Sequence, residues 1–321
     1  MLNRRDLLLA SAAAGIAMQN RTAFAKAAQP SIKVNFEVPA HACDCHTHIH
    51  LPEKYPFFDG RVYTPEPASP EEMAALHKAL GIERVVIVTP SVYGTDNRAT
   101  LEGMKFRGDM ARGIAVIDDK TSESDLDAMG KAGIRGIRVN LATSGVNDPS
   151  IGRKRLEAAI DRVKGRGWHV QCYTNLALLT NIKDVLASSP VPVVFDHFGG
   201  ADASKGLEQP GWAELVESVK SGKVYVKISG AYRLSNKAPD YPDSVPFAKA
   251  LIAANPDRLV WGSDWPHPDS VTPPGKKPTD LTPLLQIGDA RVLNLLPVWT
   301  PDAATRKKIL VDNPARLYGF S

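Results

Sequence analysis

Short apolar segments alternate with helix-forming segments along almost the whole of this chain. Most of the apolar segments are rich in Val and Ile and are bounded by Gly, Pro or Asp, which is typical of buried strands. Eight of them occur, at Ala42–Ile49, Arg84–Pro90, Arg112–Asp118, Gly133–Asn140, Trp168–Thr174, Val191–Phe198, Val224–Gly230 and Arg258–Trp265. Eight strands that alternate with helices predict a single (β/α)8 barrel of the α/β class.

A doubly wound open sheet is the main alternative for such an alternation. An open sheet usually carries a glycine-rich phosphate-binding loop after its first strand, and no such loop follows the first predicted strand here. A length of 321 residues fits one large barrel, and 43% apolar residues can supply its core. We therefore favour the barrel and find no sign of a second domain.

Charge and cysteine content exclude several classes of protein. The net charge is only +4 and the chain has no basic tract, so we expect no nucleic acid partner. Three cysteines are too few for a disulfide scaffold. No apolar run approaches the roughly 18 residues of a spanning helix. We therefore expect no membrane span in the mature chain.

Residues 1–25 have the three parts of an export signal in the correct order. Arg4 and Arg5 precede an apolar run, and a small-x-small cleavage pattern ends at Ala25. The paired arginines indicate the twin-arginine pathway, which exports folded proteins. We expect a periplasmic protein in which residues 26–321 form one catalytic barrel.

Polar residues collect at the ends of the predicted strands, where barrels of this kind hold their active sites. The first strand ends with His46 and His48 two residues apart. Strict alternation places these histidines and Asp44 on one face, and Cys43 and Cys45 on the other. If the histidines face the barrel mouth, we expect the two cysteines to face the helix layer.

Two further strand ends add a histidine and a carboxylate. His197 precedes a Gly-Gly turn after the sixth strand, and Asp264 follows the eighth strand beside bulky tryptophan rings. We expect this apolar setting to raise the proton affinity of Asp264. Three histidines and an aspartate can hold one divalent metal that activates water. They can equally polarise a carbonyl while the aspartate takes a proton from water.

Arginines and hydroxyl groups lie near the same strand ends. Arg138 is near the end of the fourth strand, Arg233 follows the seventh, Tyr173 ends the fifth and Ser91 follows the second. Arginine binds carboxylates bidentately, so these arginines indicate an anionic substrate. A surface salt bridge is the alternative for either arginine taken alone.

These motifs together resemble the amidohydrolase superfamily, and more narrowly its branch that contains 2-pyrone-4,6-dicarboxylate lactonase. The resemblance rests on Asp44-Cys45-His46-Thr47-His48, Phe195-Asp196-His197, Trp261-Gly262-Ser263-Asp264-Trp265-Pro266-His267-Pro268 and Asn313-Pro314-Ala315-Arg316-Leu317-Tyr318. It covers nearly all of the mature chain. As a group these motifs are specific, whereas a single His-x-His pair would be weak.

The resemblance implies a distorted (β/α)8 barrel that hydrolyses a lactone. It implies that His46, His48 and His197 surround the scissile carbonyl, and that Asp264 is the general base for water. It also implies that the substrate is bound by Tyr63, Ser91, Arg138, Tyr173 and Arg233. The lactonase of this branch works without a metal, although other members of the superfamily use one or two.

Two departures from the superfamily bear on the chemistry. Its two-metal members carry a carboxylated lysine on the fourth strand, where this chain has Arg135 and Arg138, so we expect no two-metal site. The lactonase has a further arginine six residues after the position of Arg138, and this chain has Ser144 there. Because one carboxylate clamp is lost, a lactone with one carboxylate or a sugar lactone becomes as good a candidate as the dicarboxylate.

The leading hypothesis is therefore a periplasmic hydrolase that opens a small acidic or sugar lactone without a cofactor. One alternative is a mononuclear metal-dependent hydrolase or decarboxylase of the same superfamily. It would hold one zinc or manganese ion on His46, His48, His197 and Asp264. A second alternative is an exported binding protein that kept the barrel and lost the chemistry.

Overall fold

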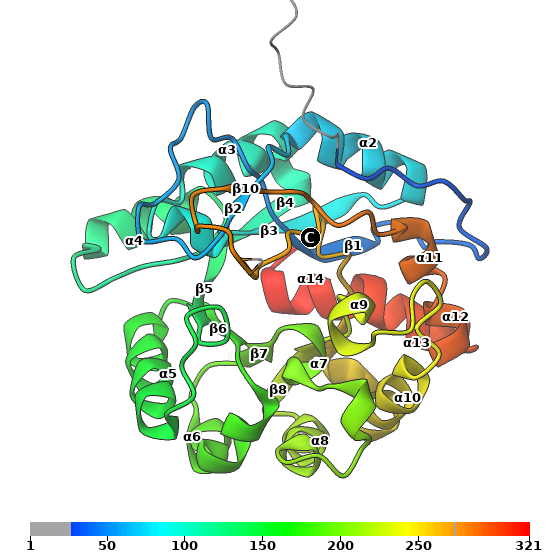
Figure 1. Ribbon diagram of the computed structural model, residues 1–321. Helices are drawn as coiled ribbons and strands as arrows, with labels where there is room; N and C mark the ends of the chain where they lie inside the picture. The colour runs from blue at the N-terminus through cyan, green and yellow to red at the C-terminus, as the bar shows by residue number, and fades with distance from the viewer. Residues whose placement is uncertain (1–26, 273) are drawn as a thin grey trace, which may run out of the picture.

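The computed structural model describes residues 27–272 and 274–321 (Figure 1). Within these residues, eight parallel strands form one sheet, and each strand lies within or overlaps one predicted segment. In their order across the sheet they are β1 (Cys43–Thr47), β3 (Arg84–Val88), β4 (Ala111–Ala115), β5 (Ile134–Asn140), β6 (His169–Tyr173), β7 (Val193–Phe195), β8 (Val224–Lys227) and β9 (Leu259–Val260). The prediction of a (β/α)8 barrel is confirmed.

Closure of the barrel between the last strand and the first is irregular. The segment after β9 meets β1 through a parallel bridge between Thr47 and Trp265. Two backbone bonds complete this junction: the His48 amide donates to the Trp265 carbonyl at 2.8 Å, and the Asp264 amide donates to the His46 carbonyl at 2.9 Å. The junction therefore brings Asp264 directly beside the two histidines of the first strand.

Helices surround the strands in Figure 1. They are α2 (Pro70–Leu80), α3 (Arg98–Arg107), α4 (Glu123–Lys131), α5 (Pro149–Val163), α6 (Lys183–Ser188), α7 (His197–Gly200), α8 (Trp212–Lys220), α9 (Ala231–Leu234), α10 (Ser244–Ala254), α11 (Asp289–Leu293), α12 (Leu296–Trp299), α13 (Ala303–Lys307) and α14 (Asn313–Tyr318). Two short strands, β2 (Thr64–Pro65) and β10 (Leu281–Thr282), pair separately in parallel. Capping boxes begin α2 at Ser69 and α4 at Ser122, which fixes where these helices start.

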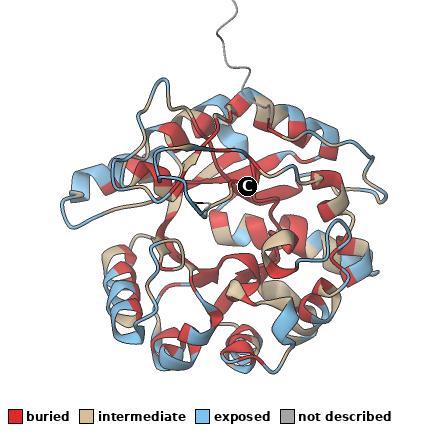
Figure 2. Ribbon diagram, in the orientation of Figure 1, coloured by how far each residue is buried: buried red, intermediate tan, exposed pale blue. Residues whose placement is uncertain are grey.

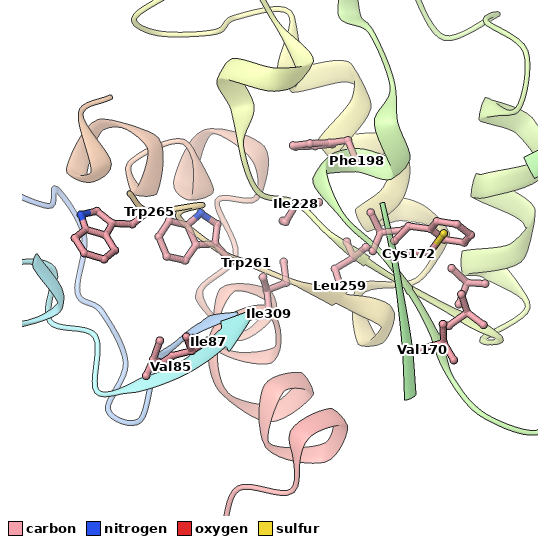
Figure 3. Close-up of a cluster of buried hydrophobic side chains, with 14 of the residues drawn as sticks. Val85, Ile87, Val170, Cys172, Phe198, Ile228, Leu259, Trp261, Trp265 and Ile309 are labelled. Carbon is pink, nitrogen blue, oxygen red and sulfur yellow. The ribbon is translucent and has the colours of Figure 1, made fainter. Parts of the chain in front are cut away.

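The strands of the barrel have buried side chains on both faces, one toward the helix layer and one toward the barrel interior. In Figure 2 the strands are mostly buried, and the outer faces of the helices are exposed. On β3, Ile87 lies against Gly103 of α3, so it faces the helix layer. Val86 points the other way, into the barrel. Figure 3 shows part of the main apolar cluster, with Trp261 and Trp265 on the segment that follows β9.

The expected facing of the first strand is wrong in one respect. Cys43 and Cys45 pack with Val86 and with Tyr318 of α14 in the barrel interior, not against the helix layer. Asp44 is the residue that faces outward, because its Oδ2 lies 3.2 Å from Nε2 of His77 on α2. The register of β1 shifts between Asp44 and Thr47, and this irregularity turns His46 inward directly after Cys45.

The predicted export signal at residues 1–25 lies outside the described residues and stays a prediction. Among the residues that the structure describes, no helix is both long and apolar enough to cross a membrane.

Candidate active site

The four predicted catalytic side chains meet at the carboxyl ends of the strands. His46 and His48 come from the end of β1, His197 begins α7 directly after β7, and Asp264 follows β9. Oδ1 of Asp264 lies 3.6 Å from Nε2 of His46, and 3.7 Å from Nε2 of both His48 and His197. The folded chain thus places one carboxylate oxygen against three imidazole nitrogens.

The two oxygens of Asp264 have different surroundings. Oδ2 accepts hydrogen bonds from the Tyr232 hydroxyl at 2.6 Å and from Nε of Arg233 at 2.5 Å. Oδ1 is buried and has no hydrogen-bond partner among the described residues. Asp264 also has a left-handed backbone with φ of 68°, a strained conformation for a residue that is not glycine. The oxygen left free is therefore the one that faces the histidines.

The expectation of a raised proton affinity for Asp264 is wrong. Burial alone would raise the pKa of this carboxyl. The guanidinium of Arg233 outweighs burial and holds the pKa of Asp264 well below its usual range. The apolar tryptophan rings flank the carboxylate in sequence, but a cation decides its charge. Asp264 is ionised at neutral pH.

The three histidines are neutral at neutral pH. Burial lowers the pKa of His46, lowers that of His48 well below its usual range, and lowers that of His197 to about 3. Nδ1 of His48 lies 2.7 Å from the Val88 carbonyl, which can only accept, so the proton of neutral His48 is on Nδ1. Its Nε2 therefore offers a lone pair to the site. Nδ1 of His197 lies 3.0 Å from the Ser229 hydroxyl.

A second layer of buried charge supports this cluster from below. Asp196, directly after β7, accepts from Arg138 at 3.3 Å and from Gln171 at 3.0 Å. Lys227 of β8 lies 3.5 Å from the same carboxylate, and His46 lies 3.2 Å from it. Burial raises the pKa of Asp196, but Lys227 and Arg138 outweigh this and hold it well below its usual range.

The predicted binding residues line one small cavity above the histidines. Its walls include eight of the nine predicted site residues, and the ninth, His46, lies beneath it with Nε2 only 3.3 Å from Nε2 of His48. The predicted lining residues are Tyr63, Ser91, Arg138, Tyr173, Arg233, His48, His197 and Asp264. The structure thus brings together every site residue that the sequence predicted.

Neither arginine forms the surface salt bridge considered as an alternative. The Arg138 side chain is 5% exposed and bonds to the buried Asp196, and Arg233 is 17% exposed and bonds to the buried Asp264. Each guanidinium therefore links a buried carboxylate to the wall of the cavity.

Ser144 does not line the cavity of the site. Its hydroxyl donates to the Asn140 carbonyl at 2.7 Å, and it lines an adjoining, larger open cavity. The two cavities share Ser91, Arg138 and Asn140. The larger cavity also reaches Arg155 on α5. Space for a substituent is thus available next to the reaction site.

The donor atoms at the centre of the site fit one divalent metal ion. His46, His48 and Asp264 form a buried group of nitrogen and oxygen ligands, and no group in the described part of the chain hydrogen-bonds to Oδ1 of Asp264. Ligands of a tetrahedral zinc ion lie about 3.3 Å apart, given bonds of 2.0–2.1 Å. The distances of 3.3 to 3.7 Å between these atoms match that spacing. His46, His48 and Asp264 are the residues that would hold the ion, whereas His197 groups instead with His46 and Asp196.

Several functional residues were not predicted from the sequence. The sequence pattern does not distinguish Lys227 or Gln171, and it includes Asp196 only within the motif Phe195-Asp196-His197. The sequence signal for Lys227 is that a charged residue ends the apolar strand Val224–Lys227, because a buried lysine needs a partner. Tyr232, which anchors Asp264, gave no signal beyond its place next to Arg233.

Comparison with known proteins agrees with this geometry. The chain is 35% identical over 301 residues to a 2-pyrone-4,6-dicarboxylate hydrolase of Comamonas testosteroni, covering 91% of this chain and 94% of that protein. It is 34% identical to a 4-sulfomuconolactone hydrolase of Rhizobium radiobacter, covering 90% and 93%.

A solved structure is similar as well. It is that of a probable 2-pyrone-4,6-dicarboxylic acid hydrolase from Acinetobacter baumannii with citric acid bound, with a TM-score of 0.71 and 25% identity. The similarity covers 87% of this chain and 100% of that one. A profile of the family described as amidohydrolase matches residues 43–320. With the barrel and its buried histidine and aspartate cluster, this match shows that the chain belongs to the amidohydrolase family.

Proposed function

We propose that this protein is a hydrolase that opens a small anionic lactone with Asp264 as the general base. The observation that carries the proposal is the asymmetry of Asp264. Its Oδ2 is anchored by Tyr232 and Arg233, while its buried Oδ1 faces three imidazoles and has no hydrogen-bond partner within residues 27–272 and 274–321. A carboxylate held in this way can take a proton from a water molecule placed in the cavity.

The reaction follows from the donors and acceptors around that water. Oδ1 of Asp264 removes one proton from the water as the water oxygen attacks the lactone carbonyl. The lone pair of His48 Nε2 accepts a hydrogen bond from the other O–H of the water and so orients the water molecule. Imidazole N–H groups of His46 and His197 stabilise the oxyanion that forms. The C–O bond of the ring then breaks, and protonated Asp264 returns its proton to the leaving oxygen. The product is a hydroxy acid.

The negative charge of the substrate is expected to increase the basicity of Asp264. Arg233 neutralises Asp264 in the structure and thereby weakens it as a base. An anionic group of the substrate that shares the guanidinium withdraws part of this charge and makes Oδ1 more basic when the lactone is bound. The relatives named for a dicarboxylate and a sulfonated lactone, and the citric acid in the Acinetobacter structure, support an anionic substrate.

A bound divalent ion is the second candidate, because the donor atoms fit one. Held by His46, His48 and Asp264, such an ion would supply a Lewis acid for the carbonyl and lower the pKa of a bound water. Arg138 and Arg233 would orient the substrate in this case as well.

We predict that the full chain, purified without added metal, hydrolyses anionic lactones and keeps its rate in a chelator. The panel contains 2-pyrone-4,6-dicarboxylate, a lactone with one carboxylate and a sugar lactone. The matched control is the methyl ester of each acid, which has no anionic group to share Arg233 with Asp264 and is expected to lower kcat/KM by about 10- to 100-fold. Ring opening is followed by ultraviolet absorbance or by acid release.

The other candidates give different results in the same assay. Loss of the rate in chelator, restored by stoichiometric zinc or manganese, assigns the chemistry to the mononuclear metal enzyme. Tight lactone binding with no turnover under either condition supports a binding protein and overturns the proposal.

We also propose that the protein is exported to the periplasm by the twin-arginine pathway, on the strength of the Arg4-Arg5 pair and the apolar run after it. We expect replacement of both arginines by lysine to retain the protein in the cytoplasm of a Gram-negative host. Arg21→Lys, which changes a basic residue outside the pair, is the control and should export normally. Cell fractionation measures the outcome, and equal periplasmic amounts of the two variants would contradict the proposal.

A further inference from the structure

Lys227 is a buried cation that has no part in the proposed reaction. It ends the apolar strand β8 and is fully buried beneath the histidine cluster. Its Nζ donates to the Cys45 carbonyl at 2.8 Å and to Oε1 of Gln171 at 2.6 Å, and it lies 3.2 Å from Nδ1 of His46. Burial of an ammonium costs free energy, so a lysine buried at this position calls for a functional explanation.

The directions of these hydrogen bonds follow from chemistry. The Cys45 carbonyl can only accept. Gln171 presents its Oε1 to Lys227 because its Nε2 donates to Asp196 at 3.0 Å. An ammonium has three N–H groups and no acceptor, so the third N–H of Lys227 is available to His46. Nδ1 of His46 then accepts, and the proton of the neutral ring is on Nε2.

Asp196 is the competitor for the same nitrogen. Its Oδ1 also lies 3.2 Å from Nδ1 of His46 and would favour a proton there. However, only the contact with Lys227 has the geometry of a hydrogen bond, and Oδ1 of Asp196 has no hydrogen-bond partner among the described residues. Nδ1 of His46 is thus assigned as the acceptor of a hydrogen bond from Lys227.

The other side of the His46 ring leads to the same assignment. Nδ1 of His48 donates to the Val88 carbonyl, so Nε2 of His48 carries a lone pair. Nε2 of His46 lies 3.3 Å away. This contact is favourable when His46 carries a proton on Nε2, whereas two lone pairs facing each other would repel. Lys227 and His48 therefore agree on the tautomer.

We infer that Lys227 is a positioning residue that holds the proton of His46 on Nε2, so that the site presents His46 as a hydrogen-bond donor and not as a metal ligand. A metal on Nε2 requires the proton to move to Nδ1, where it would face the ammonium. Lys227 thus opposes metal binding by a donor set that otherwise fits one. The donation to a lactone carbonyl rests on the proposed function; the tautomer and the effect on metal affinity do not.

The tautomer is measured directly by nitrogen NMR on the full chain labelled with ¹⁵N-histidine and freed of metal. We expect a protonated, pyrrole-type Nε2 and a pyridine-type Nδ1 for His46 in the unsubstituted protein. The signals are assigned by their loss in His46→Gln. In Lys227→Met, which keeps the length of the side chain and removes its charge and donors, we expect the proton to move to Nδ1 and face Asp196.

Zinc affinity gives a second readout that does not depend on turnover. We expect the dissociation constant for zinc, measured by competition with a chromophoric chelator, to fall at least tenfold in Lys227→Met. Lys223→Met is the matched control, because Lys223 is exposed just before β8, and its zinc affinity should equal that of the unsubstituted protein. In lactone hydrolysis, Lys227→Met should lower kcat more than it changes KM.

Two results would overturn the inference. One is a proton on Nδ1 of His46 in the unsubstituted, metal-free protein, which needs no variant to fold. The other is a folded Lys227→Met protein with unchanged tautomer and zinc affinity. A protein that shows the expected tautomer but opens no lactone leaves this inference standing and removes the proposed function.

Discussion

Replacement of Asp264 by asparagine is expected to lower kcat for lactone hydrolysis by about 10³-fold, within the range of general-base catalysis, while substrate binding changes little. The reason is the asymmetry of this side chain. The amide oxygen of asparagine can stay with Tyr232 and Arg233 in the place of Oδ2. The amide nitrogen then replaces Oδ1, and it cannot take a proton from water.

Steady-state kinetics and equilibrium binding of a slow substrate check this prediction. Tyr232→Phe is the matched control, because it removes one hydrogen bond to Oδ2 and leaves the base oxygen in place. We expect it to lower kcat by about tenfold at most, the cost of one hydrogen bond. If Asp264→Asn retains kcat within tenfold of the unsubstituted protein, Asp264 is not the base.

Replacement of Asp196 by asparagine is expected to destabilise the fold by about 3–5 kcal/mol, the usual cost of removing one partner from a buried charge network. Asp196 is fully buried and is the carboxylate that Arg138 and Lys227 share. Without its charge, the two cations remain buried with no counterion next to them. The free energy of unfolding in urea measures the effect.

Two further variants serve as controls for the Asp196→Asn measurement. Asp184→Asn removes a carboxylate that pairs with Arg153 on the exposed surface, and the urea midpoint should hardly move. The double variant Asp196→Asn/Lys227→Met removes one cation along with the carboxylate, so it should be more stable than Asp196→Asn alone. A loss below about 1 kcal/mol in Asp196→Asn would show that water, not Asp196, compensates these cations.

Much of the site was predictable because its residues follow strands in the sequence. Parallel strands of a barrel end on the same face, so His46, His197 and Asp264 had to meet once the eight strands were recognised. Arg138 and Tyr173 could be placed by the same argument. Tyr63 lies before α2, between β1 and β3, and only the resemblance pointed to it.

The errors arose where local pattern and tertiary geometry disagree. Strict alternation placed Cys45 and His46 on opposite faces, but the irregular register of β1 turns both inward. The tryptophans next to Asp264 suggested an apolar carboxyl with a raised pKa. Arg233, 31 residues earlier in the chain, reverses that expectation.

The sequence by itself determined the number and order of the strands, the ends at which polar residues gather, and the family to which those motifs belong. These are properties of local pattern, because hydrophobic periodicity and turn residues act over a few positions. Only the tertiary structure decided the charge states and hydrogen-bond directions: the ionised Asp264, the neutral histidines, and the lysine beneath His46. Such properties depend on burial and on distances of a few ångströms between groups on different strands, and no pattern along one segment contains them.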